Sequence, residues 1–448
     1  MPRQPVVITG VGIVSAIGTG RESFFESLLN ARSGIRSLSE RNDGGAKPPT
    51  DQEPDGLWIG APVTDFEPKQ YVKPRKALKV MCREIQTAFA AAQLAAQDAG
   101  LGEDVPAHDQ GAIAPDRLGV VFGSEIFFNP PEELIESILA CVDEAGKLHP
   151  GRFGGAARRE VMPLWMLKYL PNMPACQVGI SLNSRGPNNS LVLGDVSGPA
   201  AVLESESYLQ RGIADMVFAG ATGTRLGATR LLYRTDMPTA NRNGVAIEDA
   251  SRPHASDSSG VVGGEAAASL VIESAEHASK RGAKVLAEIT ATASRFHASK
   301  AMETTKRTTE VETPATRASA KAIEASIRAV MGEAAISSKD IGAIISHGLG
   351  ERQMDAAEAT AITVCELTAP AVAVAASIGH AGAASGMMSL ATGALVAAEC
   401  KVPPTRGAGP DRGLNLIQQT QPLAAPYVLC LSHTSDGSAM AVLLKSLR

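Results

Sequence analysis

Apolar runs and helical patterns alternate along this chain, and that alternation predicts an α/β protein. Apolar runs too short for a helix are typical of strands buried on both faces of a sheet. We expect such strands at residues 117–124, 214–220, 341–346, 371–376 and 427–431. Helical patterns predict helices over 22–30, 71–100, 317–331, 355–365 and 384–399. Polar stretches at 36–58 and 294–313 are expected to be exposed loops.

Residues 186–220 predict a strand at 190–193, a tight elbow at 194–198, a helix and a second strand. Such an elbow points one side chain and several backbone N–H groups above the sheet, where the helix N-terminus adds partial positive charge. Catalytic nucleophiles are often placed this way, but the side chain here is Asp195. A similar strand, glycine-rich elbow and small-residue helix recur at 372–398, which predicts an internal duplication with a shared core.

Composition narrows the classes of function. The chain has 448 residues, of which 44% are hydrophobic and 20% charged, and its net charge is −5. The negative charge argues against nucleic-acid binding, and no apolar run is long enough to span a bilayer. Six cysteines without CxxC spacing suggest neither disulfides nor a zinc site, so we expect no metal and a cytoplasmic location. Gly10 and Gly12 begin a dinucleotide fingerprint that lacks its third glycine, so no cofactor is expected.

Basic residues cluster near the start of the predicted helix 71–100, namely Lys73, Arg75, Lys76 and Lys79. In a protein of net negative charge, such a cluster is either a solvated helix face or a docking patch for an acidic partner. The pattern alone leaves both interpretations open.

Two histidines follow predicted strands of the second half: His347 in SHGLG and His380 in SIGHAGAASG. A lone histidine beside a glycine turn is usually structural, but two at matching strand ends suggest a shared site opposite the elbow. Their imidazoles could hydrogen-bond a carbonyl oxygen or stabilise an enolate. Asp355 and Glu358, one helical turn apart, could share a partner; the alternative is ordinary charge at a helix N-terminus.

Motifs along the whole chain resemble the β-ketoacyl-acyl carrier protein synthases, which are thiolase-like condensing enzymes. They include VVITGVGIVSAIG, LPNMPACQVGI, GPNNS, RGIADMVFAGA, GGEAAASLVIESAEHASKRGAKVLAEI, SIGHAGAASG and VPPT. The resemblance implies a five-layered αβαβα fold of two similar halves, at 1–275 and 276–448, and usually a dimer. It also implies Claisen condensation, in which an acylated cysteine is joined to a decarboxylated malonyl group. The basic residues after 71 correspond to where the family meets acyl carrier protein.

Several positions depart from the family pattern. The cysteine expected three residues before Gly198 is Asp195, and the lysine expected five residues before His380 is Ala375. The usual carboxylate partner of that lysine is retained as Glu358. The two threonines that hold the phosphopantetheine arm are replaced by Leu349 and Glu351, and the Phe- and Gly-rich gating loop is replaced by SHTSDGS at 432–438.

Condensation needs a thiolate, which a carboxylate cannot replace, so this chain alone is not expected to condense. At a helix N-terminus the pKa of Asp195 should fall, leaving a charge that repels malonate and enolate. The simplest interpretation is that Asp195 caps the helix through its backbone N–H groups.

Three hypotheses follow. The chain is a condensation-deficient, chain-length-factor-like subunit of fatty acid or polyketide biosynthesis, paired with an active synthase. Alternatively it is an acyltransferase or decarboxylase that acts on acyl- or malonyl-carrier thioesters through His347 and His380. In the third hypothesis it binds acyl chains or carrier protein without catalysis. Whether it pairs with itself or with another chain is left open.

Overall fold

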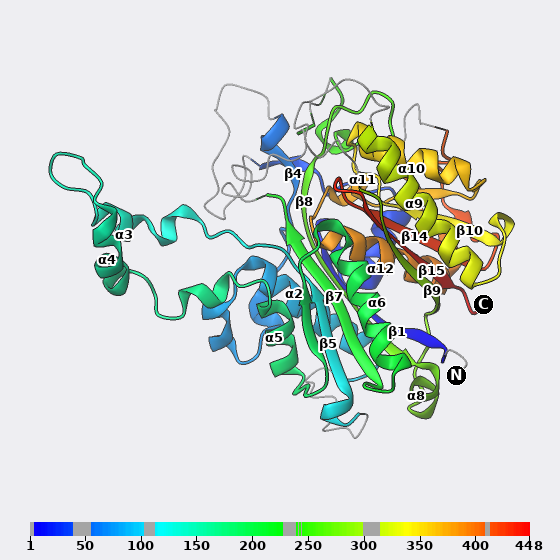
Figure 1. The fold of residues 1–448 in the computed structure, drawn as a ribbon, viewed down its shortest axis with the longest axis horizontal. Coiled ribbons are helices and arrows are strands. Elements are labelled where there is room, and N and C mark those ends of the chain that lie inside the picture. Colours follow the sequence, from blue (N-terminus) through cyan, green and yellow to red (C-terminus); the bar gives the residue numbers. More distant parts are fainter. Residues whose placement is uncertain are drawn as a thin grey trace.

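The structure, a computed structural model, describes residues 4–38, 55–102, 113–226, 239–298 except 241 and 243, 314–407 and 413–448. Its strands run edge to edge along one continuous path, in the order β11-β10-β14-β15-β9-β1-β8-β7-β5-β6. The path changes from the second half of the chain to the first where β1 (Val6–Ser15) pairs with β9 (Ala287–Phe296). Figure 1 shows these strands at the centre of the molecule.

The two halves of this path have the same topology. The first half contributes β1, β5 (Leu118–Gly123), β6 (Asn188–Leu191), β7 (Met216–Thr224) and β8 (Gly263–Ser274). The second contributes β9, β10 (Ile341–Ser346), β11 (Ala371–Ala373), β14 (Tyr427–His433) and β15 (Ser438–Lys445). Numbered along the chain, both sets lie in the order 3-2-4-5-1, with two parallel pairings followed by two antiparallel ones. The predicted internal duplication is confirmed.

Helices cover both sets of strands and also fill the space between them (Figure 1). The outer layers are α2 (Arg83–Asp98) and α5 (Met173–Ser181) in the first half, and α9 (Pro314–Glu333) and α10 (Arg352–Val364) in the second. Between the sheets lie α6 (Ser197–Gln210) and α12 (Ala384–Glu399), which pack on each other. This is the five-layered α/β architecture that the resemblance to the condensing enzymes implies.

The middle helices approach closely because their facing residues are small. A Cβ atom added to Gly198 would lie 2.7 Å from both Cβ and the backbone nitrogen of Met387. Every residue of α12 from Ala384 to Ala398 is buried. A helix with no polar face needs apolar neighbours on all sides, and the two sets of strands and α6 provide them. This packing fixes the elbow before α6 against the start of α12.

Some predicted boundaries are wrong. The pattern at 71–100 predicts one helix, but the structure has a 3₁₀ segment, η4 (Arg75–Val80), before α2. Met81 and Cys82 have extended backbones, and these two residues separate η4 from α2. Likewise the strand expected at 371–376 ends at Ala373, because α11 (Ala375–Ile378) begins directly after it. The strand expected at 190–193 lies two residues earlier, as β6.

The polar loops predicted at 36–58 and 294–313 lie mostly outside the described residues, which do not include 39–54 and 299–313. The remaining helices and short strands are α1 (Arg21–Leu29), α3 (Ile135–Leu139), α4 (Phe153–Glu160), α8 (Ala275–Lys280), β2 (Gly18–Thr19), β3 (Arg36–Ser37), β4 (Ile59–Ala61), β12 (Lys401–Val402) and β13 (Gln421–Pro422). None of the helices in the described ranges is long and apolar enough to cross a bilayer.

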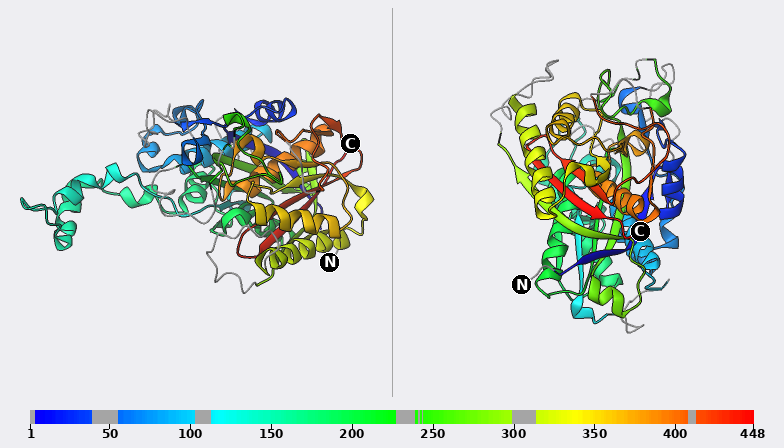
Figure 2. Two further views of the ribbon diagram at one scale, coloured as in Figure 1. Left: turned by 90° about the horizontal axis from the view of Figure 1, so that it is seen from above. Right: turned by 90° about the vertical axis from the view of Figure 1, so that its right-hand side faces the viewer.

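An arm between β5 and α5 projects far from the body of the molecule, carrying α3 and α4 at its tip (Figures 1 and 2). Its two chain segments are joined at the base, where Glu133 accepts hydrogen bonds from Trp165 Nε1 and Lys168 Nζ. Leu164 and Met166 are more than half exposed on it. None of the elements that the sequence predicts falls in this segment, so the arm is a finding of the structure.

Candidate functional site

The elbow between β6 and α6 places Asp195 inside the protein. Gly194 has φ 62°, a conformation that favours glycine, and the turn continues as η10 (Gly194–Val196) into α6. The hydroxyl of Ser197 donates to the carbonyl of Gly194 at 2.6 Å and accepts from the Leu193 backbone at 2.9 Å. The Asp195 carboxylate makes no cap, so the capping interpretation is wrong: Ser197 holds the turn.

Both predicted histidines reach Asp195 from the second half of the chain. The carboxylate lies 2.8 Å from His380 Nε2 through Oδ1 and 3.4 Å from His347 Nε2 through Oδ2. A carboxylate oxygen can only accept, so the facing Nε2 atoms carry the protons. Ser432, at the end of β14, donates to the Asp195 carbonyl at 2.8 Å. The three residues are buried and form one cluster, as the matching strand ends predict.

Asp195 is an anion at neutral pH. Burial alone would raise the pKa of its carboxyl, but the His380 and His347 imidazoles outweigh burial and hold the pKa well below its usual range. For His347 burial is the larger effect and lowers the pKa of the imidazole, while the Asp195 carboxylate opposes it. The lowered pKa of Asp195 agrees with the sequence prediction, but its cause is the two imidazoles instead of helix N–H groups.

Asp355 and Glu358, in the first turns of α10, support the loop that carries His347. Glu358 Oε1 accepts from the His347 backbone nitrogen at 2.9 Å. Asp355 accepts from the backbone nitrogens of Leu349, Gly350 and His254. Both carboxylates contact His254, whose Nε2 lies 3.5 Å from Glu358 Oε2. The hypothesis of a shared partner therefore holds, and neither carboxylate faces solvent as ordinary helix charge does.

Two further histidines belong to this cluster and are not predicted from the sequence. His254 follows the SRP motif, and His433 is the last residue of β14. His433 Nε2 lies 3.4 Å from Glu358 Oε2, and its ring meets that of His347 edge to face at 4.9 Å. The strand predicted from the sequence ends at residue 431, so the sequence places His433 in the loop 432–438. One feature of the sequence points to both histidines. Glu358 is retained, but the lysine that pairs with this carboxylate in the family is replaced by Ala375.

Little space remains beside the cluster. The cavity next to His347 has a volume of about 10 Å³, room for one water molecule, and is lined by Leu349, Ala375 and Met388 among others. Pockets that bind small ligands usually measure ~300–1,000 Å³. An acyl chain therefore does not fit in this cavity.

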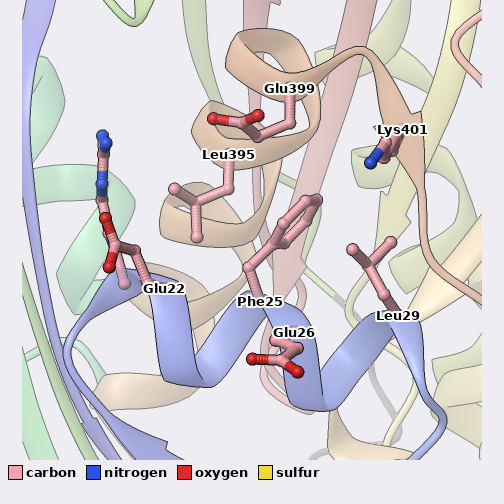
Figure 3. A pocket seen from close by; sticks show the side chains of 8 residues that line it. Glu22, Phe25, Glu26, Leu29, Leu395, Glu399 and Lys401 are labelled. Carbon is pink, nitrogen blue, oxygen red and sulfur yellow. The ribbon is translucent and has the colours of Figure 1, made fainter.

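A larger cavity, of about 290 Å³, lies between α1 and the end of α12 (Figure 3). Phe25, Leu29 and Leu395 are its apolar residues, and charged side chains surround them. No predicted site residue lines it, so its volume carries no information about the chemistry.

The predicted basic residues are all exposed: Lys73, Arg75, Lys76 and Lys79. They lie on and before η4, so they share a 3₁₀ turn instead of a helix face. Within the described ranges no group of three or more His, Cys, Asp or Glu side chains could hold a metal ion.

Comparison with known proteins agrees with this fold. The profile of the β-ketoacyl synthase N-terminal domain matches residues 3–278, and that of the C-terminal domain matches residues 287–408. A polyketide β-ketoacyl synthase of Streptomyces cyaneus is 27% identical over 98% of this chain and 97% of its own. The 3-oxoacyl-[acyl-carrier-protein] synthase 2 of Staphylococcus aureus (strain COL) is 28% identical over 80% of this chain and 76% of its own.

Solved structures show the same fold. The ishigamide ketosynthase/chain length factor matches with a TM-score of 0.76 at 22% identity, covering 100% of both chains. A type II polyketide ketosynthase in complex with its acyl carrier protein matches with a TM-score of 0.76 at 20% identity, again over 100% of both chains. With both domain profiles matched over most of its length, the chain belongs to the β-ketoacyl synthase family.

Proposed function

We propose that this protein is a condensation-deficient β-ketoacyl synthase homologue that pairs with an active synthase and influences the length of the chain that the synthase builds. The observation that carries the proposal is the contact of Asp195 with both His347 and His380. The side chain at the nucleophile position is an anion already bound by the two imidazoles.

This arrangement opposes condensation in two ways. A carboxylate cannot form the thioester that condensation requires, because a thiolate is both the nucleophile and the leaving group. In addition, the Nε2–H groups of His347 and His380, which could stabilise a developing oxyanion, are both directed at Asp195. A substrate oxyanion would have to displace the carboxylate and lie beside its negative charge.

The same geometry weighs against the second hypothesis, decarboxylation of a malonyl thioester. Decarboxylation needs no nucleophile, but it needs the imidazole N–H groups free to face the enolate oxygen. The cavity of about 10 Å³ beside His347 leaves no room for the thioester. We therefore rank decarboxylation below partnership, and the experiment below distinguishes the two.

A surface for the partner is available at the edge of the first half. Strand β6 is the last strand of the described sheet path, and Asn188 and Asn189 on it are exposed. Around it lie exposed apolar side chains from α5, the elbow and the end of β5: Ile126, Ile180, Val192 and Leu193. An apolar patch beside an open sheet edge is typical of protein interfaces. The similar ishigamide structure is described as a ketosynthase/chain length factor, which is consistent with a pair of related chains.

We further propose that acyl carrier protein meets the basic residues Lys73, Arg75, Lys76 and Lys79. Acyl carrier proteins are partners in the similar solved structure, and an exposed cationic cluster on a protein of net charge −5 fits an acidic partner. The proposed setting is the cytoplasm, where the six cysteines, all free in the structure, stay reduced.

The experiment is co-expression with a β-ketoacyl synthase from the same organism that retains the cysteine. Native mass spectrometry should show a one-to-one complex, and product analysis should show a change in chain length when this protein is omitted. The protein alone, given malonyl-carrier protein, should release no CO₂. A stable homodimer that never binds a synthase would contradict the proposal, and CO₂ release that is lost in His380→Ala would favour the catalytic alternative.

Matched variants locate the interface. Ile180→Asp places a charge where the side chain is 74% exposed, so the fold should survive while complex formation fails. Val364→Asp is the control: it lies on α10 in the other half and is 47% exposed. Equal loss of complex in both variants would contradict an interface at β6.

A further inference from the structure

Large apolar side chains are exposed mainly on the arm between β5 and α5 and around its base. Of the sixteen that are exposed in the described residues, twelve lie between Ile126 and Leu193. Eight of these, from Ile135 to Met166, lie on the arm itself. Single exposed apolar residues are normal on a protein surface, but such a concentration of them is typical of an interaction site.

The arm has almost no core of its own. In the segment 130–166, which the structure describes throughout, the buried residues are Ser137, Cys141 and Ala156, all of them small. Small side chains bury too little apolar surface to offset the conformational entropy that an ordered segment of this length loses. The body does not cover the arm either, because the arm projects away from it (Figures 1 and 2). A binding partner would supply the core that the arm lacks.

Leu164 and Met166 are the most exposed apolar side chains of the arm, at 65% and 61%. Leu164 also has φ 69° and ψ 9°, a left-handed conformation that costs free energy for a residue with a Cβ atom. The two residues flank Trp165, whose Nε1 donates to Glu133 at 2.7 Å and so fixes the turn to the opposite segment of the arm. Strained backbone of this kind is concentrated in binding sites, where the surrounding structure holds it in place.

The charge of the arm restricts the kind of partner. The segment 130–166 contains six acidic and four basic residues. It is therefore not the cationic surface that an acidic carrier protein, a nucleic acid or an anionic membrane would need. Apolar side chains surrounded by charges of both signs are typical of interfaces between two folded proteins.

The position of the arm indicates that the partner has the same fold. The arm leaves the body after β5 and returns to it at α5, and both elements pack beside β6, the last strand of the described sheet path. The apolar side chains of the arm thus continue the patch beside that open strand edge. Related chains pair about a two-fold axis by presenting the same surface to each other, and a second edge strand completes the first. A standard interface takes about 20–30 residues from each chain, which is more than the patch at the edge provides without the arm.

We propose that the arm is a partner-binding element whose anchor residues are Leu164 and Met166. The partner is a second chain of this fold, and its assignment as an active synthase rests on the proposed function above. On pairing, the two anchors enter apolar surface of the partner chain. The exposed apolar side chains of the arm leave water at the same time, so pairing stabilises the segment 130–166.

Hydrogen–deuterium exchange followed by mass spectrometry tests whether the partner covers the arm. The protein alone is compared with its purified complex with a cysteine-retaining synthase. Peptides from 130–166 should exchange at least about tenfold more slowly in the complex. Peptides from α8, which packs on β1 and β8, are the internal control and should not change.

Two outcomes separate this inference from the proposed function. A complex in which the arm exchanges as fast as in the unpaired chain would overturn the inference and leave the proposed function standing. Protection of the arm in a homodimer that binds no synthase would support the inference and contradict the proposed function.

Variants test the anchor residues. Leu164→Gly suits the left-handed backbone, so the isolated protein should unfold at the same urea concentration or a higher one, while the affinity for the partner should fall about tenfold or more. Met166→Ser is a second variant with the same expected loss of affinity. Phe296→Ser is the control, because that side chain is 60% exposed on β9 in the other half and its loss should change the affinity less than about twofold. Unchanged affinity in both anchor variants, or an equal loss in the control, would overturn the anchor role.

Discussion

His380 Nε2 and Asp195 Oδ1 lie 2.8 Å apart although the residues are 185 positions apart in the chain. Asp195 belongs to the elbow of the first half, and His380 precedes α12 of the second. The contact therefore joins the two halves of the duplicated fold at the elbow. The side chain that the elbow directs into the protein is held by a histidine of the opposite half.

Replacing Asp195 with Asn should destabilise the protein. The amide keeps the size of the side chain but loses the charge that faces His380 and His347, and its NH₂ group meets an imidazole N–H donor. We expect the free energy of unfolding to fall by about 1–3 kcal/mol at pH 7. Urea denaturation followed by circular dichroism measures it, and an unchanged midpoint would contradict a stabilising contact between Asp195 and the two histidines.

The difference between wild type and Asp195→Asn should depend on pH. The folded-state pKa of Asp195 is depressed, so its contribution is fully present above the unfolded-state pKa of about 3.9 and is lost as the pH falls through the folded value. Denaturation curves at pH 7 and 5 should therefore show the same gap between the two proteins, and the gap should close below about pH 4. A gap that widens between pH 7 and 5 would show that protonation of the neighbouring histidines contributes to the difference, and a gap that closes in this range would contradict the depressed pKa of Asp195.

The sequence predicts most strands and helices of this fold, because strands covered on both faces appear as short apolar runs, and the five layers follow from the resemblance to the family. It also predicts a shared site for His347 and His380 opposite the elbow of Asp195, because both histidines follow strands at matching places in the second half. The partners of Glu358 could not be predicted in this way. His254 and His433 reach it from segments distant in the chain, and one strand boundary misplaced by two residues hides His433.

The arm and η4 are not predicted from the sequence, for a different reason. Arm residues such as Leu164 and Met166 are apolar yet exposed, so the rule that apolar residues are buried gives no pattern there. At 71–100 the residues have helical spacing, but the extended backbone at Met81 interrupts the helix. Local propensity is a weak signal where tertiary packing decides the break.

The contact between α6 and α12 should not tolerate a methyl group at Gly198. A Cβ atom there would lie 2.7 Å from the backbone nitrogen of Met387, which cannot rotate away as a side chain can. We expect Gly198→Ala to lower the free energy of unfolding by about 1–3 kcal/mol. Gly155→Ala on α4, where a Cβ meets nothing within 4 Å, should be neutral or stabilising by up to ~1 kcal/mol. Similar losses in both variants would argue against close helix packing as the cause.

The basic residues on and before η4 should govern binding of acyl carrier protein. Reversing Lys76 and Lys79 to Glu should weaken binding about tenfold or more at low salt, and the difference should shrink at high salt because the side chains are exposed. Lys339→Glu, an exposed lysine in the other half, is the control. Isothermal titration calorimetry at two salt concentrations provides the measurement, and equal binding by all variants would leave the basic cluster as a solvated surface.

Restoring the nucleophile alone should not restore condensation. Asp195→Cys would supply a thiol beside His347 and His380, but the family lysine is Ala375 and the cavity beside His347 has room for about one water molecule. An acyl chain would have to displace α12 residues such as Met388, which is fully buried. We expect a turnover at least a hundred times below that of an ordinary synthase of the family, about 3 kcal/mol in activation free energy. Mass spectrometry of products from malonyl- and acyl-carrier protein measures it. A rate near that of an active synthase would show that the single carboxylate, and none of the other departures, had abolished condensation.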